Sequence, residues 1–212
     1  LDNIDLFDSG FFEITPAEAR AMDPQQRRFL QVAYACFEDA GYAGTRIKDS
    51  RTGVYVSAAM ANYAEALSEF TPISVPGNVP AFAASRVSYI YNLTGPSFVT
   101  NATCASSMLA LHEACLGLMN GDADIALVGG VNIFPFPING TEIFMNAAGI
   151  MSEQQRCRPF DQNASGIGRG EGVVALLLKP LKKAIADHDN IHAVIVATAV
   201  NNDGASAGIT AP

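Results

Sequence analysis

Residues 97–119, SFVTNATCASSMLALHEACLGLM, decide the fold because their hydrophobic pattern changes within a few positions. Residues 97–102 have the pattern of a strand, whereas residues 106–119 form a largely apolar helical segment that ends at Asn120-Gly121. The small residues between the two segments predict a tight strand-to-helix turn. Because the helix is apolar around most of its circumference, we expect it to be buried.

Strands and helices alternate on both sides of this unit. Thr15-Pro16 and Asp23-Pro24 are typical helix starts, and Gly41 is a typical helix end. Further strands are expected at residues 53–59, 125–134, 173–179 and 191–200, and further helices at residues 81–91 and 180–187. The strand at 125–134 is apolar on both faces and should be central, and the strand at 173–179 should also be buried. The alternation predicts an α/β fold whose helices cover a mostly buried sheet.

The remaining polar and glycine-rich segments have structural interpretations. Asp23, Gln25, Gln26 and Arg27 form a polar helix opening, which we expect to be a capped and solvated helix end. Residues 135–172 are the least regular part of the chain, and we expect loops there. They end in a glycine run, GIGRGEG, but a strand follows it where a dinucleotide-binding motif needs a helix, so these glycines should serve close backbone packing.

Composition excludes several classes of protein. The 212 residues are 49% hydrophobic and 16% charged, which is typical of a globular protein with a sizeable core. A formal net charge of -8 argues against a general nucleic-acid binder. The sequence has no apolar run long enough for a transmembrane helix, and its first residues are not those of a signal peptide. Its four cysteines include no CxxC pair, which favours a reducing, cytoplasmic compartment.

Cys104 is the residue best placed for chemistry, since it lies in the turn between the strand and the helix. At a helix N-terminus the macrodipole and the free backbone N–H groups favour the nucleophilic thiolate. The same N–H groups can hold an oxyanion. A buried structural cysteine would fit this position equally well. Position alone therefore leaves both interpretations open.

The three histidines are poorly arranged for catalysis. His112 lies eight residues after Cys104 on the same expected helix, about 12 Å further along, and we expect it to be a core or supporting residue. His188 and His192 flank a polar turn and should be solvated. The sequence holds no HxH, HExxH or His–Cys cluster, so no metal site is expected.

Four stretches of the chain carry recognisable motifs in a fixed order. Residues 7–42 contain MDPQQR, and residues 95–112 surround Cys104. Residues 156–180 contain RPFD and GEG, and residues 199–212 end in GITAP. In this order the stretches resemble the β-ketoacyl synthase (ketosynthase) domains of modular type I polyketide synthases, whose active-site block corresponds to residues 95–112. The chain departs from the family around the nucleophile, where Asn101-Ala102-Thr103 replaces Asp-Thr-Ala and Ala105 replaces Ser.

The resemblance implies a thiolase-like α/β fold with αβαβα layers when complete. Residues 1–212 would be the N-terminal part of a ketosynthase domain, the first half only, without its extreme N-terminal strand and its C-terminal half. The two histidines that the family uses, the first in an HGT motif, would follow Pro212. We therefore expect this 212-residue piece alone to be inactive.

The resemblance also implies a reaction, a decarboxylative Claisen condensation in polyketide biosynthesis. Cys104 would accept the acyl chain, and Phe160, in the RPFD block, would either line the acyl pocket or serve structural packing. The family needs no metal or bound cofactor, because phosphopantetheine arrives covalently on an acyl carrier protein. The implied partners are that carrier protein and a second copy of the intact domain, with no nucleic acid and no membrane, and the implied location is the cytoplasm.

Two other classes stay open. A non-catalytic dimerisation or scaffold piece would carry a thiol that never takes up acyl groups. A cysteine hydrolase or thioesterase would need a histidine and an Asp or Asn arranged against Cys104. The hydrolase elbow has glycines two residues before and after its nucleophile, and Ala102 and Ser106 stand there in this chain.

Overall fold

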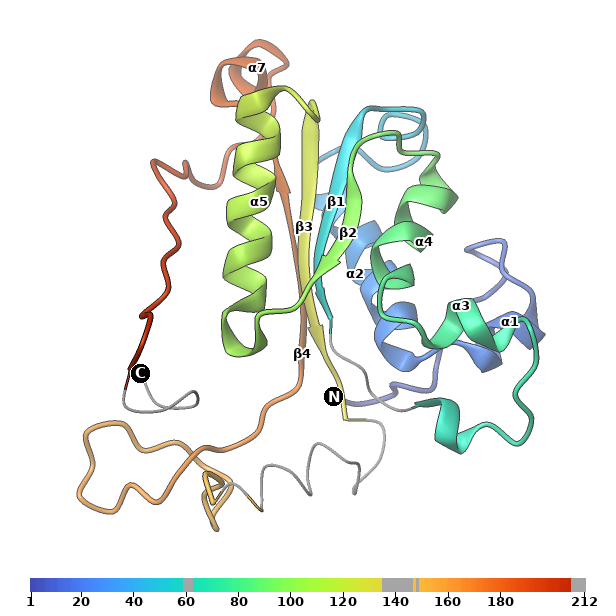
Figure 1. Cartoon of the computed structure of the whole chain (residues 1–212). Coiled ribbons are helices and arrows are strands. Elements are labelled where there is room, and N and C mark those ends of the chain that lie inside the picture. Colours follow the sequence, from blue (N-terminus) through green and yellow to red (C-terminus); the bar gives the residue numbers. More distant parts are fainter. Residues whose placement is uncertain (59–62, 135–146, 148, 207–212) are drawn as a thin grey trace.

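A single mixed sheet organises the computed structural model, which describes residues 1–58, 63–134, 147 and 149–206 (Figure 1). Its strand order is β2-β1-β3-β4. Strands β1 (Thr52–Ala58), β2 (Ser97–Thr100) and β3 (Ile125–Asn132) run parallel, and β4 (Gly172–Leu178) runs antiparallel to β3. The parallel strands therefore end at the same edge of the sheet, and β4 begins there.

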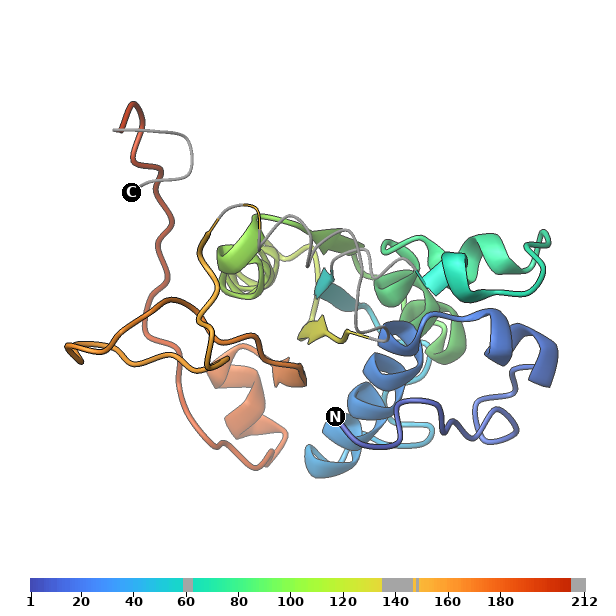
Figure 2. The ribbon, with the colours of Figure 1, turned by 90° about the horizontal axis from the view of Figure 1, so that it is seen from below.

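Helices cover both faces of the sheet. Figure 2 shows α5 (Ser106–Asn120) on one side of the strands and α2 (Pro24–Asp39) with α4 (Phe82–Tyr91) on the other. Because successive strand residues point to opposite faces, Val54 and Val56 of β1 join the α2–α4 side, whereas Tyr55 packs under α5. The described residues also form five short helices: α1 (Pro16–Ala21), η1 (Tyr63–Ala66), α3 (Ser74–Asn78), η2 (Thr103–Ala105) and α7 (Leu181–Ala186).

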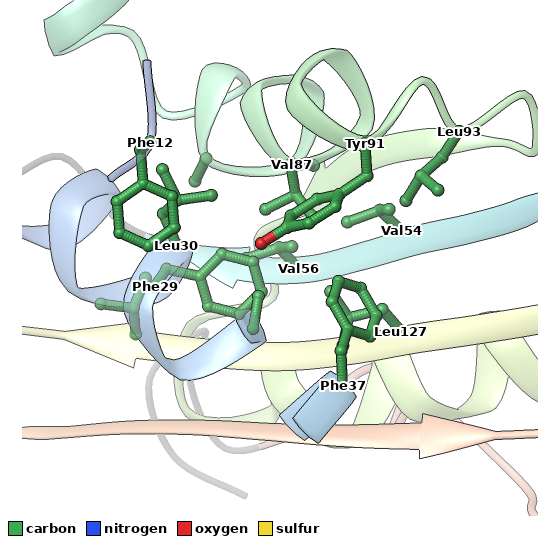
Figure 3. Close-up of a cluster of buried hydrophobic side chains, with 14 of the residues drawn as sticks. Phe12, Phe29, Leu30, Phe37, Val54, Val56, Val87, Tyr91, Leu93 and Leu127 are labelled. Atoms are coloured by element: carbon green, nitrogen blue, oxygen red, sulfur yellow. The ribbon is translucent and has the colours of Figure 1, made fainter. Parts of the chain in front are cut away.

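The larger core lies between the sheet and the α2–α4 pair (Figure 3). Phe29 and Phe37 of α2 are fully buried, and the Phe37 ring meets Tyr91 of α4 edge-on at 5.1 Å. Phe29 can approach β3 closely because position 129 is glycine. A Cβ atom at Gly129 would lie only 2.0 Å from Cε2 of Phe29. The glycine is therefore required for the helix to pack directly on the strand.

The expected strand-and-helix pattern is largely confirmed. The expected strands at 53–59, 97–102, 125–134 and 173–179 correspond to β1 to β4, and β3 is central as predicted. Thr15 and Asp23 cap α1 and α2 as expected, because their side chains accept hydrogen bonds from Glu18 N and Gln25 N. Part of the expected loop region, residues 135–146 and 148, lies outside the described residues, and its described remainder consists mainly of turns and loops.

Two predictions that apolar segments are buried are wrong. On β4, Val174 and Leu176 are 61% and 52% exposed, because β4 is the edge strand and α2 covers only its other face. On α5, only the side that carries Ser106, Ala110, Ala114 and Gly117 is buried, while Met108 and Met119 are exposed. The small residues face the sheet, and Leu111 and Leu118 are only partly buried beside them. Overall apolarity predicted burial, but the sheet buries only one face of the helix.

The predicted strand at residues 191–200 is also wrong. The segment is irregular, and no described strand pairs with it. It runs past α5, where Thr198 hydrogen-bonds His112, and Val196 is 94% exposed. Alternating apolar residues favour an extended backbone, but a strand also needs a neighbouring backbone for its N–H and C=O groups.

The polar start of α2 is capped, as predicted, but it is not solvated. Asp23, Gln25, Gln26 and Arg27 are all buried. The amide of Gln26 donates to Pro76 O at 3.0 Å and Val79 O at 3.2 Å, so the helix end docks against α3 and the residues that follow it. Burial raises the pKa of Asp23, against the opposing effect of its hydrogen bonds with Gln25. These side chains are polar because they satisfy backbone groups inside the protein.

A buried ionic cluster joins the end of β4 to the loop after α2. Lys179 and Asp189 have only 8% and 10% of their side chains exposed, and their charged atoms lie 2.6 Å apart. Tyr42 OH accepts from Lys179 at 2.6 Å and donates to Asp189 at 2.9 Å. Burial acts to raise the pKa of Asp189, but hydrogen bonds from Lys179 and Tyr42 outweigh it and hold the pKa below its usual range.

We expect Asp189→Asn to lower the free energy of unfolding by about 2–4 kcal/mol at pH 7, because it leaves the Lys179 charge poorly compensated. A carboxyl with a lowered pKa stabilises the fold above its unfolded pKa of about 3.9 and loses that effect as the pH falls through the folded value. The difference in the free energy of unfolding between wild type and Asp189→Asn, measured with urea, should therefore decrease as the pH is lowered below about 5. Asp187→Asn, at a more exposed partner of Lys179, is the control with a smaller effect. A difference that stays constant with pH would contradict the assignment.

Candidate active site

The turn between β2 and α5 presents Cys104 to solvent. After β2 the chain forms one 3-10 turn, η2 (Thr103–Ala105), and α5 begins directly at Ser106. Cys104 is exposed. The predicted position of the thiol, between a strand and a helix N-terminus, is confirmed, and the alternative of a buried structural cysteine is wrong for the structure as described.

Thr103, the residue before Cys104, has a strained backbone. Its φ angle is 51°, in the left-handed region that β-branched residues avoid. Such a conformation costs on the order of 1–3 kcal/mol and persists only where its surroundings hold it. Strain of this kind next to an exposed thiol is typical of a functional turn.

Hydrogen bonds within the turn hold this geometry. The hydroxyl of Ser106 accepts from Ala102 N at 2.7 Å and donates to Thr103 O at 2.6 Å. Thr103 N donates to the side chain of Asn101 at 3.1 Å, and Ala105 N donates to Ala102 O at 3.2 Å. The backbone around the cysteine is therefore tied at several points.

The amide N–H of Cys104 itself is not used in these bonds. Within the part of the chain that the structure describes, it donates to no acceptor. An N–H group at this position can donate to the oxygen of a substrate bound to the Cys104 sulfur, where negative charge develops during acyl transfer. The turn thus combines an exposed thiol with an available donor at a helix N-terminus.

The other cysteines lack this combination. Burial, with a smaller effect of Asp39, raises the pKa of the Cys36 thiol to about 11. Burial also raises the pKa of Cys115, on α5. Cys157 is exposed, and its sulfur lies 3.2 Å from Gly168 N, but it lies in a loop and not at a helix N-terminus. Cys36 and Cys115 are therefore poor nucleophiles near neutral pH, and Cys157 is the matched exposed control.

The histidines make other contacts. Nδ1 of His112 lies 2.8 Å from Thr198 Oγ1, and Nε2 of His192 lies 3.0 Å from Asp39 Oδ2 on the surface. His188 is exposed. No hydrogen bond in the described structure joins any of the three to Cys104, so none of these three histidines is arranged as the base that a cysteine hydrolase needs. The described residues also contain no group of three or more His, Cys, Asp or Glu side chains that could hold a metal ion.

The loop before β4 carries the remaining candidate residue, Phe160. The ring of Phe160 is fully exposed, and its φ angle is 64°. Nearby, Gly166 lies against the backbone of residues 150–152, where a Cβ atom would be 2.6 Å from Ile150 O. The prediction that the glycine run serves close backbone packing is confirmed at Gly166, and the run leads into β4. The role of Phe160 in an acyl pocket stays a prediction.

Two features of the site were missed in the sequence. Neither the left-handed backbone of Thr103 nor the double hydrogen bond of Ser106 was predicted. The available signal was a serine at the first position of the expected helix, since serine at a helix start commonly bonds nearby backbone groups.

Comparison with known proteins agrees with this structure. A family model described as "Beta-ketoacyl synthase, N-terminal domain" matches residues 1–184. The curated relatives include Polyketide synthase PksM of Bacillus subtilis, 44% identical, and 6-methylsalicylic acid synthase of Aspergillus niger, 43% identical. Each alignment covers 100% of this chain but only 5% and 12% of the respective relative.

Solved structures of ketosynthases share the fold. The ketosynthase from module 6 of the bacillaene synthase of Bacillus subtilis 168 is 42% identical with a TM-score of 0.91, and the match covers 100% of this chain and 36% of that one. The oxazolomycin ketosynthase domain OzmH KS7 of Streptomyces albus JA3453 is 36% identical with a TM-score of 0.90, and the match covers 37% of its chain. This chain thus spans about a third of those structures.

These similarities confirm the expected thiolase-like α/β fold. Among the described helices, none has the length and apolar character required to cross a membrane. A chain that matches this family model along most of its length, and superposes closely on ketosynthases of polyketide synthases, belongs to the β-ketoacyl synthase family.

Proposed function

We propose that this chain carries the nucleophile of a β-ketoacyl synthase that performs decarboxylative Claisen condensation in polyketide biosynthesis. The observation that carries the proposal is the exposed Cys104 on its strained turn, with an available amide N–H at the start of α5. Family membership supplies the class of reaction.

The proposed reaction begins with transfer of an acyl chain from an acyl carrier protein. The Cys104 thiolate attacks the carbonyl carbon of the phosphopantetheine thioester, and the Cys104 N–H stabilises the developing oxyanion. Collapse forms the Cys104 thioester and breaks the C–S bond to the carrier, whose thiol leaves with a proton. Phosphopantetheine thus enters covalently attached to its carrier protein.

The second half of the reaction forms the carbon–carbon bond. A malonyl-type extender on a carrier protein loses CO2, and the resulting enolate carbon attacks the Cys104 thioester carbonyl. The Cys104 thiolate leaves, and the β-ketoacyl chain remains on the carrier. Loss of CO2 needs donors that stabilise the enolate charge, and the three histidines of this chain all lie elsewhere in the fold.

We therefore propose that residues 1–212 act as the N-terminal part of a ketosynthase domain whose further residues supply those donors. The exposed apolar residues Met108 on α5, Val174 on β4 and Val196 support this, because an apolar surface of this kind usually packs against further protein. The intact domain is proposed to form a homodimer, as expected from its family. The cytoplasm is the proposed compartment, in agreement with four unpaired cysteines.

Phe160 is proposed to line the acyl pocket. Its fully exposed ring on a left-handed backbone supports a contact with substrate, because nothing in the described structure packs against it. Phe160→Ala should raise the KM for the acyl donor and leave kcat nearly unchanged. Phe70→Ala, at an exposed phenylalanine of another loop, is the control. An unchanged KM in the Phe160→Ala variant would show that Phe160 does not line the acyl pocket.

The test of the proposed function supplies acyl-loaded and malonyl-loaded carrier proteins to the full-length protein. A β-ketoacyl carrier protein and CO2 are the expected products. The 212-residue chain alone should give no condensation product, because its histidines are not at Cys104. Release of free acid without condensation would identify a hydrolase, and the absence of any acyl uptake would leave a scaffold role; either result contradicts the proposal.

A further inference from the structure

The hydroxyl of Ser106 is buried and hydrogen-bonds two backbone groups of the strained turn before Cys104, the N–H of Ala102 and the C=O of Thr103. We propose that Ser106 is a positioning residue, which holds Thr103 in its left-handed conformation and thereby fixes the direction of the Cys104 side chain. The inference rests on the proposed role of Cys104 as the nucleophile. It concerns the backbone of the turn, because both hydrogen bonds of the Ser106 hydroxyl are to backbone groups.

The geometry of the two hydrogen bonds supports this role. Ser106 Oγ accepts from Ala102 N at 2.7 Å and donates to Thr103 O at 2.6 Å. These two backbone groups lie on either side of Thr103, so one hydroxyl fixes the chain before and after its φ and ψ torsions. Ser106 is only 5% exposed, which limits competition from water. By contrast, the bond from Thr103 N to Asn101 is on the surface.

The sequence explains why such a hold is needed. Glycine adopts a φ of 51° without steric cost, but Thr103 carries a branched Cβ that disfavours it. A threonine free of restraint would return to a negative φ. Because Cys104 directly follows, that change would turn its side chain and its N–H away from their present directions.

The hydroxyl also determines which donor is available to substrate. It satisfies the N–H of Ala102, and the Thr103 and Ala105 N–H groups have acceptors within the turn. Among the amides from 102 to 105, in the described structure, the Cys104 N–H is the one with no acceptor. Ser106 thus keeps the turn in the arrangement that directs a single amide toward a bound carbonyl.

The experiment compares three variants of the full-length protein: Ser106→Ala, Ser107→Ala, and the double variant Thr103→Gly/Ser106→Ala. Ser107 is the matched control, since it is the exposed neighbouring serine. The measurements are kcat and KM for acyl transfer, and the pH dependence of Cys104 alkylation by iodoacetamide. Ser106→Ala should lower kcat about 10- to 100-fold with KM within about twofold, as for a misplaced catalytic group. Ser107→Ala should stay near wild type.

The double variant distinguishes positioning from a general loss of structure. Because glycine needs no hold at positive φ, Thr103→Gly/Ser106→Ala should recover most of the lost kcat and the wild-type alkylation profile. A Ser106→Ala protein with wild-type kcat would overturn the proposal, as would a loss that the glycine does not recover. If Ser106→Ala alone fails to fold, Thr103→Gly in the wild-type background serves instead: retained kcat supports the proposal, and a large loss overturns it.

Alkylation separates this inference from the proposed function, because iodoacetamide reacts with the thiol whether or not the protein transfers acyl groups. A wild-type protein that takes up no acyl group, but whose alkylation is slowed by Ser106→Ala and recovered by the glycine, would refute the function and support the positioning role. Normal acyl transfer by the wild-type protein, with no effect of Ser106→Ala on kinetics or on alkylation, would support the proposed function and refute the positioning role.

Discussion

Cys104→Ala is expected to lower acyl uptake and β-ketoacyl formation by at least about 1,000-fold, because the substitution removes the sulfur atom that we propose bonds to the acyl chain. The side chain is exposed and makes no described hydrogen bond, so thermal stability should be nearly unchanged. The measurement is product formation from acyl- and malonyl-loaded carrier proteins by the full-length variant.

Cys157→Ala is the matched control for this prediction. It removes the other exposed thiol of the chain and should leave activity within about twofold of wild type. Cys36 and Cys115 are less informative, because both are partly buried and their substitution also disturbs packing. A Cys104→Ala protein that keeps more than a tenth of the wild-type rate would show that another group carries the acyl chain.

Phe29→Ala is expected to lower the free energy of unfolding by about 3–5 kcal/mol, the range measured for phenylalanine truncation in protein cores. Phe29 is fully buried between α2 and the sheet, directly over Gly129. The loss combines removal of a large apolar side chain from the core with a cavity that the neighbouring strand cannot fill. Urea unfolding, followed by a signal from this part of the protein, measures the change.

Phe70→Ala provides the control for the core prediction. Phe70 is exposed, and its truncation should change stability by less than about 0.5 kcal/mol. A decrease of less than about 1 kcal/mol in the free energy of unfolding of Phe29→Ala would mean that the packing of α2 on β3 contributes less to the stability of the core than described.

The strand-to-helix unit could be predicted from sequence because its signals are local. The pattern change across residues 97–119 is contained within one short segment, and the structure has β2, the turn and α5 there. The central place of β3 could also be predicted, since a strand with two neighbours and helices on both faces needs apolar residues throughout.

The predictions that failed all concern which other segments pack against a helix or strand in the folded protein. The pattern of residues 191–200 is that of a strand, but pairing depends on a second strand that the pattern does not specify. The apolar outer side of α5 and the open face of β4 were expected to be buried for the same reason. Conversely, Gln25 and Gln26 were expected to be solvated, although they satisfy buried backbone groups of distant segments.

The features of the candidate site likewise divide into those that the sequence predicts and those that depend on contacts in the fold. Cys104 could be identified from its position and from the family resemblance, since both are properties of the sequence. The restraint that the Ser106 hydroxyl places on Thr103 could not be predicted, because it depends on one backbone torsion and two hydrogen bonds that composition and spacing do not encode. In the proposed account, Thr103, which stands where the resembled motif has alanine, is the residue whose conformation the Ser106 hydroxyl maintains.

The most direct test of the account is to locate the acyl group. The full-length protein is incubated with an acyl-loaded carrier protein, without extender, and its peptides are mapped by mass spectrometry. We predict a hydroxylamine-sensitive acyl thioester on Cys104, with Cys36, Cys115 and Cys157 unmodified. An acyl group on any of those three cysteines, with Cys104 unmodified, would contradict the account.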